Sequence, residues 1–357
     1  MPKFIDILVI LFRFINNTIQ SYHTKLENPQ MSQTTKIRWL IAHEPVKLFL
    51  RTAEAFSAKI AELTDGKFEI EIFTPSHYFE QAKLTGYENN LGNFYRDNGP
   101  IIEMEQGNIE ISQVHINELA MWCNTDFWAL EMPFLFRDHE HASRVFEGPI
   151  GKGLLGTIEE TSPAKGMAFT YSGGFRCVVS ETPINDISDM KGLSYAINTN
   201  PVAVDTVLAL GGVPESFSIR DYVKKVTEEG FNSTLLETTI PRYLAQFQGT
   251  NKKHLINTKH SLFLTSIIIS KAFWESLDAV DQAAFEEASM YASQLERQWS
   301  VDDSVEFAAK DNHDDIGVTY QELSDVDTAK FKELTAPLYD KYQHFFQPGL
   351  LDGIIKS

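Results

Sequence analysis

A strand, an amphipathic helix and a second strand follow one another between residues 37 and 72. The apolar run Ile37 to Ile41 suits a buried strand. From Val46 to Leu63, apolar residues recur every three or four positions, which predicts a helix with one apolar face. Asp65-Gly66 ends this helix, because glycine accepts the left-handed backbone. Between Phe68 and Ile72, apolar and charged residues alternate as in a strand. The unit predicts an α/β fold with a parallel strand pair.

The same kinds of element recur in the middle of the chain. Residues 166–171 and 175–179 are expected to form two strands separated by Gly173-Gly174. Asn200-Pro201 predicts a helix start, because the asparagine side chain can cap it and proline suits the first helical position. Ser218 with Asp221 resembles a capping box for a helix that ends near Glu229. The β-branched and aromatic run 262–269 predicts a buried strand.

The last third contains a long stretch without glycine or proline. From Lys271 to about Asn312, apolar residues keep helical spacing, which predicts a helix of some forty residues laid across two lobes. Asp278 offers a cap for a restart, so two abutting helices remain an alternative. The chain shows no obvious linker, and we therefore expect lobes built from interleaved segments.

Length and charge limit the possible classes. A chain of 357 residues exceeds one average domain, so two lobes are expected. With 49 acidic against 31 basic residues, the net charge is −18, which argues against a nucleic-acid partner. The two cysteines, Cys123 and Cys177, are too few for a disulfide framework or a four-thiolate metal site, and two free buried thiols are expected.

The first thirty residues have three interpretations. Residues 4–15 form an apolar run that is short for a membrane span and is interrupted by Asp6 and Arg13. It is an atypical secretion signal or anchor, or translation begins at Met31, or the run is an amphipathic helix of the fold. We set residues 1–35 aside as a signal-like or spurious extension.

Motifs of catalysis are sparse, and no cofactor is expected. The sequence lacks a nucleophile elbow, a phosphate-binding glycine loop and a His-Glu-x-x-His pair. The cluster from Asp138 to His141 is interpreted as a solvated helix start rather than a metal site. Arg176 stands out, because it lies within an apolar strand after two glycines. It grips a ligand carboxylate in a cleft, or it forms an internal ion pair with an acid of the fold.

The sequence resembles the extracytoplasmic solute-binding proteins of TRAP transporters, the DctP family. The resemblance covers about residues 37–346, and its motifs occur in the family's order. They are Ala42-His43, Asp65-Gly66-Lys67, Gly107 to Ile111, Pro133 to Asp138, Gly174-Phe175-Arg176, Asp189 to Leu193, Leu210 to Pro214, His260 and Trp274.

This resemblance implies the fold and the function. The expected fold is α/β and periplasmic-binding-protein-like, with a cleft between two lobes and a long helix spanning both. Lobe one would comprise residues 36–160 and 249–290, lobe two residues 161–248 and 291–345, and residues 346–357 a C-terminal tail. The protein would capture a small organic solute in the periplasm, most often a carboxylate, and deliver it to TRAP membrane permease subunits.

Departures from the family pattern affect the expected ligand site. The strand after Lys191-Gly192-Leu193 usually carries a ligand-binding arginine, and Ala196 stands in its place. Glu237 can replace an acidic residue of the family motif only if this segment is aligned with the motif in a shifted register. We carry forward the interpretation that Arg176 faces the cleft without a neutralising acid and binds the ligand anion. The full expected ligand set is His43, Glu44, Arg176, Asn198, Asn200, Phe217 and Glu237.

Each of these residues also has a structural interpretation. His43 and Glu44 would otherwise cap the first helix, and Phe217 would pack in a core. Arg242 and Lys253 are further candidates for which surface placement is expected. Two other functions remain: a ligand sensor or scaffold without transport, and an acid/base enzyme that uses His43 or His260 with Glu237.

Overall fold

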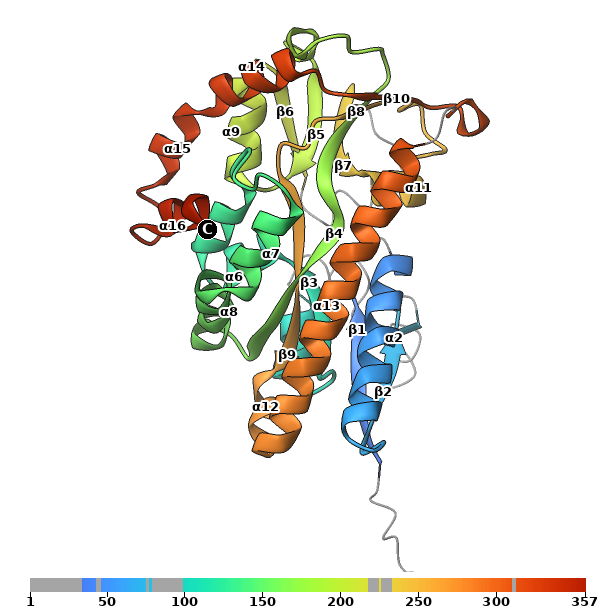
Figure 1. The fold of residues 1–357 in the computed structure, drawn as a ribbon, viewed down its shortest axis with the longest axis vertical. Helices are drawn as coiled ribbons and strands as arrows, with labels where there is room; N and C mark the ends of the chain where they lie inside the picture. Colours follow the sequence, from blue (N-terminus) through green and yellow to red (C-terminus); the bar gives the residue numbers. More distant parts are fainter. Residues whose placement is uncertain are drawn as a thin grey trace, which may run out of the picture.

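A mixed β-sheet runs through both lobes of the computed structural model, which describes residues 34–42, 46–74, 77–78, 99–217, 225, 233–309 and 313–357 (Figure 1). Its main path has the order β2-β1-β3-β9-β4-β7-β5-β6, and β8 and β10 join through β4. The strands are β1 (Thr35–Ile41), β2 (Phe68–Phe73), β3 (Ile111–His115), β4 (Ala164–Ser180), β5 (Ser194–Asn198), β6 (Val213–Phe217), β7 (Leu235–Thr239), β8 (His254–Asn257), β9 (Leu262–Ser270) and β10 (Thr319–Glu322).

Helices cover this sheet on both faces. They are α2 (Val46–Leu63), α5 (Gly99–Glu105), α6 (Ile116–Trp122), α7 (His139–Glu147), α8 (Pro149–Thr161), α9 (Pro201–Ala209), α11 (Ile240–Gln246), α12 (Lys271–Ser276), α13 (Ala279–Ala308), α14 (Asp325–Thr335), α15 (Pro337–Tyr342) and α16 (Leu350–Lys356), with short 3₁₀ turns η1 (Thr125–Glu131), η2 (Ile187–Met190) and η4 (Asp314–Ile316). None of the helices in the described residues is long and apolar enough to cross a membrane.

The predicted N-terminal unit is confirmed. β1 and β2 pair in parallel, and α2 connects them with its apolar face packed under Trp39. Asp65 and Gly66 both take positive φ where the helix ends. The predicted cap of α9 is also present, because the side chain of Asn200 accepts a hydrogen bond from the backbone N–H of Val202. The predicted helix from Ser218 to Glu229 lies almost wholly outside the described residues.

β4 is the strand that links the lobes. Its first part pairs with β9 from Ala164 to Phe175, and its second part pairs with β7 from Arg176 to Ser180. We call the half built on β1, β2, β3 and β9 lobe one, and the half built on β5, β6, β7, β8 and β10 lobe two. The expectation of two separate strands here is wrong, because the two glycines form an irregularity inside one strand and do not end it.

Gly173 is fixed by its surroundings as well as by its backbone. It has φ of +93°, and a Cβ added there would lie 2.4 Å from Oγ1 of Thr239 on β7. We expect Gly173→Ala to lower the free energy of unfolding by about 1–3 kcal/mol, because alanine strains this conformation and displaces β7. Gly153→Ala on α8 is the control, since a Cβ there meets nothing within 4 Å. Urea titration that gives both variants equal stability would contradict this account.

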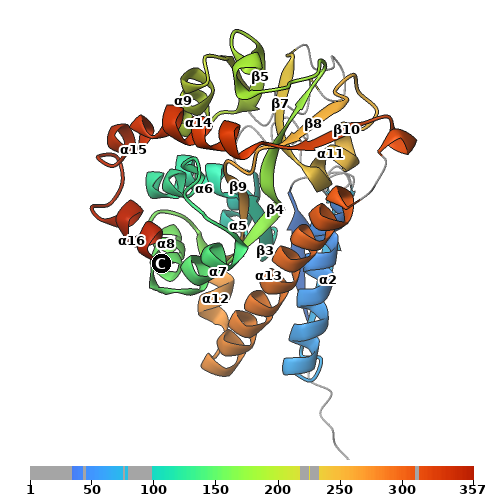
Figure 2. The ribbon, with the colours of Figure 1, turned by 45° about the horizontal axis from the view of Figure 1, so that its top comes forward.

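The long C-terminal helix joins the cores of both lobes. Figures 1 and 2 show α13 running beside α2 and then along β4. Phe285, Ala288 and Ala292 belong to the core of lobe one, whereas Phe307 belongs to a core of lobe two. The prediction of one forty-residue helix is wrong, and the alternative of two abutting helices is confirmed. Asp278 accepts hydrogen bonds from the N–H groups of Val280 and Asp281 and separates α12 from α13.

The C-terminal segment of the chain crosses from lobe two back to lobe one. α14 packs beside α9, and α16 packs on α8 near the C-terminus (Figure 1). Leu351 and Ile354 of α16 are buried in the core of lobe one.

Asp138 caps α7 by accepting a hydrogen bond from the N–H of His141. Both cysteines are free; Cys177 is buried and Cys123 is half-buried.

Candidate functional site between the lobes

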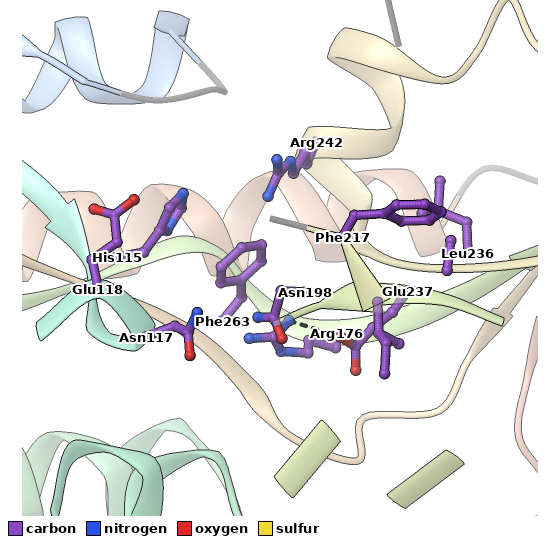
Figure 3. A pocket seen from close by; sticks show the side chains of 12 residues that line it. His115, Asn117, Glu118, Arg176, Asn198, Phe217, Leu236, Glu237, Arg242 and Phe263 are labelled. Carbon is purple, nitrogen blue, oxygen red and sulfur yellow. Dashed lines mark hydrogen bonds and ion pairs between the residues drawn. The ribbon is translucent and has the colours of Figure 1, made fainter. Parts of the chain in front are cut away.

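A pocket lies where the two lobes meet and is partly open to solvent (Figure 3). Lobe one contributes side chains from β3, α6 and β9, and lobe two contributes side chains from β5, β6, β7 and α11, with β4 between them. The lining residues are His115, Asn117, Glu118, Phe263, Arg176, Ala196, Ile197, Asn198, Phe217, Leu236, Glu237 and Arg242.

Strand ends explain why these residues converge. Asn198 and Phe217 are the last residues of β5 and β6, which pair in parallel, and His115 is the last residue of β3. Open α/β sheets place their ligand sites at the carboxyl ends of strands, where the chain turns away and leaves a crevice. The pocket therefore lies where this fold class binds ligands.

Arg176 lines the pocket but is already paired. Its Nη2 donates to Oε1 of Glu131, and its Nη1 donates to Oε2 of Glu237, both at 3.0 Å. The side chain is 3% exposed, and its guanidinium carbon lies 4.0 Å from the ring centre of Phe263. The expectation of a guanidinium without a neutralising acid is therefore wrong, and the internal ion pair is the alternative that the geometry shows. Whether Arg176 also touches a ligand stays a prediction.

Arg176, Glu131 and Glu237 form a buried cluster in which neighbouring charges shift one another's pKa. Burial acts to raise the pKa of Glu237, but the charge of Arg176 and the hydrogen bond from His260 outweigh it and lower the pKa to about 2. Burial dominates at Glu131, so its pKa is raised although Arg176 opposes the shift. The pKa of Arg176 is raised, because its two acids outweigh the effect of burial. Glu237 is thus a firm carboxylate partner of Arg176.

The other expected ligand residues fall into three groups. Asn198, Phe217 and Glu237 line the pocket. Asn200 does not line it, because its side chain is fully buried, caps α9 and donates to Oε2 of Glu131 at 2.6 Å. His43 and Glu44 lie outside the described residues.

Two basic candidates differ in their placement. The surface position expected for Arg242 is wrong, because the side chain is 7% exposed and lines the pocket from α11. Lys253 is half-buried, donates through Nζ to the carbonyl of Gln248 at 2.8 Å, and does not belong to the lining. The imidazole of His260 contacts Glu237, with 2.9 Å between Nε2 and Oε1, but His260 does not line the pocket either.

The comparisons with known proteins identify the family. Residues 42–344 match the profile of "Bacterial extracellular solute-binding protein, family 7", called DctP. The chain belongs to this family. It is 22% identical over 290 residues to the C4-dicarboxylate-binding periplasmic protein DctP of Rhodobacter capsulatus, covering 80% of each protein.

Solved structures of TRAP periplasmic solute-binding proteins share the fold. One is the protein from Polaromonas sp. JS666 bound to D-erythronate, with a TM-score of 0.73, 21% identity, and coverage of 90% of this chain and 98% of that one. Another is the protein from Shewanella oneidensis with bound succinate, with a TM-score of 0.72, 16% identity, and coverage of 91% and 99%. The predicted two-lobed fold is confirmed.

The departure at residue 196 lies inside the pocket of this DctP-family protein. Ala196 is 1% exposed and is one of the lining residues, so the position expected to carry an arginine presents a methyl group. Its neighbour across the parallel pair with β7 is Leu236, which lines the pocket too. This part of the wall is therefore apolar.

Several site residues of this DctP-family protein escaped the sequence analysis. His115 is the last residue of β3 and Asn117 and Glu118 lie in the first turn of α6, and these polar residues shortly after the Gly107 to Ile111 motif were a usable signal. Phe263 was assigned to a buried strand without a facing direction. Glu131, the partner of both Arg176 and Asn200, had no signal, because it ends a short 3₁₀ turn and is distant from both in the chain.

Proposed function

We propose that this family 7 protein captures a small organic acid between its lobes in the periplasm and delivers it, chemically unchanged, to the membrane permease subunits of a TRAP transporter. One observation carries the proposal: the pocket is lined from both lobes and includes two arginines, Arg176 and Arg242. Family membership supports solute binding outside the cytoplasm.

Lobe closure provides the mechanism. A solute in this pocket contacts His115 and Phe263 of lobe one together with Asn198 and Leu236 of lobe two. Both sets of contacts exist together only when the lobes are close, so the solute binds the closed form more tightly and shifts the population toward it. The closed form is then the one that a permease recognises.

An organic acid agrees with the relatives. Their reported ligands include C4-dicarboxylates, D-erythronate and succinate, all of which carry a carboxylate. An arginine binds a carboxylate through two parallel hydrogen bonds, and such charge-assisted bonds are among the strong ones in proteins. The position of His260 outside the lining supports binding without acid/base catalysis by the His260–Glu237 pair.

Thermal unfolding in the presence of candidate solutes tests the proposal. We expect at least one organic acid to raise the melting temperature, because a ligand at 100 times its Kd stabilises the folded state by about 2.7 kcal/mol. Matched neutral sugars and the amides of the same acids are expected to leave it unchanged. Native mass spectrometry would then show the acid bound with its mass unaltered.

Two outcomes would contradict the proposal. If no organic acid in a broad panel shifts the melting temperature, a scaffold or sensor function without such a ligand gains support. If the bound acid is converted to a product, the protein acts as an enzyme.

A further inference from the structure

We propose that Asn117 of lobe one and Asn198 of lobe two together bind one hydroxyl group of the solute. Asn117 donates a hydrogen bond to the hydroxyl oxygen, and Asn198 accepts one from the hydroxyl hydrogen. This inference rests on the proposed function, because it names two residues of that site that select among organic acids. The solute is then an acid that carries at least one hydroxyl.

The two walls of the pocket differ in polarity. Lobe one presents polar side chains where β3 passes into α6, and these are His115, Asn117 and Glu118. Lobe two presents mostly apolar surface from β5, β6 and β7, formed by Ala196, Ile197, Phe217 and Leu236. Asn198 is the polar residue at the end of β5 in this second wall. Each wall therefore contains one carboxamide side chain.

Asn117 presents a donor to the pocket. Its Oδ1 accepts a hydrogen bond from Nε1 of Trp128 at 2.9 Å. An indole N–H can only donate, so this bond identifies the amide oxygen and leaves Nδ2 on the other side of the amide. Asn117 is 6% exposed, and its Nδ2 has no acceptor within the described residues. Figure 3 shows this amide pointing from α6 toward the side of the pocket where Asn198 and Arg176 lie.

Asn198 has an acceptor that the described part of the chain does not satisfy. The side chain is half-buried, and its Oδ1 is buried without a hydrogen-bond donor. A buried acceptor without a donor is costly, because the water that it lost has not been replaced. A solute that donates a hydrogen bond to this oxygen removes that cost and gains affinity.

A hydroxyl group matches this pair of side chains. Its oxygen accepts from Nδ2 of Asn117, and its hydrogen is donated to Oδ1 of Asn198. A keto oxygen or a second carboxylate accepts but does not donate, and an ammonium group donates but does not accept. Because the two asparagines belong to different lobes, one hydroxyl gains both bonds only when the lobes are close.

Four-carbon acids that differ in one group test the hydroxyl by calorimetry. We expect 2-hydroxybutanoate or 3-hydroxybutanoate to bind at least about tenfold more tightly than butanoate, which leaves both amides without a partner. The keto acids 2-oxobutanoate and acetoacetate, and the amino acid 2-aminobutanoate, are expected to bind more weakly than the hydroxy acids. Malate against succinate and D-gluconate against hexanoate repeat the comparison for other sizes and charges.

Isosteric variants test the two asparagines. Asn117→Asp keeps the acceptor for Trp128 and removes the donor, and Asn198→Leu removes the amide. The new charge of Asn117→Asp repels every acid, so the measured quantity is the ratio of the Kd values of butanoate and its hydroxy acid. We expect each variant to lower this ratio about 2–10-fold, the usual effect of one hydrogen bond. Asn198→Asp keeps an acceptor, and the preference for the hydroxy acid is expected to survive in it.

Asn251→Leu is the matched control. Asn251 is exposed, donates to Oε1 of Glu181 at 2.8 Å, and does not belong to the lining. The ratio of the two Kd values is expected to be unchanged in this variant. Circular dichroism of each variant without ligand checks that it is folded.

The outcomes separate this inference from the proposed function. If acids bind but hydroxy acids bind no more tightly than their parent or keto acids, the proposed function stands and the hydroxyl is wrong. Tighter binding of 2-aminobutanoate would show that an acid such as Glu118 receives an ammonium group, which also overturns it. An unchanged ratio in either folded variant, Asn117→Asp or Asn198→Leu, overturns the joint role of the two residues. If no acid binds at all, the proposed function itself fails, and this inference fails with it.

Discussion

Arg176→Met is expected to lower the free energy of unfolding by about 3–5 kcal/mol at pH 7, because it leaves two buried acids without their cation. Glu131 and Glu237 both accept hydrogen bonds from Arg176 and lie almost fully out of solvent. Methionine fills much of the same volume, so the expected loss is mainly electrostatic and is not due to a cavity. Urea denaturation followed by circular dichroism measures it.

A variant without the acids is the control for Arg176→Met. Adding Glu131→Gln and Glu237→Gln to the methionine variant removes both unpaired charges, and we expect it to recover most of the lost stability. Near-native stability of Arg176→Met alone would show that the cluster is not held by this arginine.

The acid limb of the stability profile gives an independent readout of the same cluster. In the wild type the pKa of Glu237 is lowered from 4.5 to about 2. Its contribution to stability is therefore fully present above pH 4.5 and is lost as the pH falls toward 2. We expect this part of the acid sensitivity to disappear in Arg176→Met, since the carboxyl no longer has the charge that lowers its pKa.

Glu296→Gln is expected to stabilise the protein at alkaline pH by several kcal/mol relative to the wild type. Glu296 lies on α13, is fully buried, and accepts a hydrogen bond from the backbone N–H of Tyr171 at 2.5 Å. Burial raises its pKa from 4.5 to about 8, although the bonds from Tyr171 and Ser300 oppose the shift. A glutamine keeps an acceptor for the Tyr171 N–H and carries no charge to bury.

The direction of the pH dependence follows from proton uptake. Between pH 4.5 and 8 the folded protein holds a proton on Glu296 that the unfolded chain releases, so wild-type stability falls by about 1.4 kcal/mol per pH unit from this group. In Glu296→Gln that slope is expected to vanish. Urea midpoints measured from pH 5 to pH 9 test it, and parallel profiles for the two proteins would show that Glu296 does not titrate with folding.

Local patterns in the sequence predicted local structure well. The β1-α2-β2 unit and the asparagine cap of α9 each depend on residues close together in the chain, and both are present. The restart at Asp278 is present too, although it was the alternative to the favoured forty-residue helix. β4 was divided wrongly, because a glycine pair is a usual end of a strand and only the pairing with β9 and β7 keeps this one continuous.

The site was harder to predict because its contacts join distant residues. Arg176 meets Glu131 and Glu237, which are 45 and 61 residues away in sequence. Nothing near Arg176 in the chain indicates that two acids approach it. Arg242 follows a proline at the start of a short helix, a place that is commonly exposed, but in the fold α11 packs against β4, α13 and β7, and Arg242 is buried. Pocket membership is decided at this tertiary level.

The shared helix α13 has a consequence for how the molecule assembles. Its first turns complete the core of lobe one, and Phe307 near its end is buried in lobe two. A fragment carrying either lobe alone would lack part of its own interior or would expose the half of this helix that belongs to the other. Neither lobe is therefore an autonomous folding unit. We expect limited proteolysis inside α13 to make both lobes unfold together.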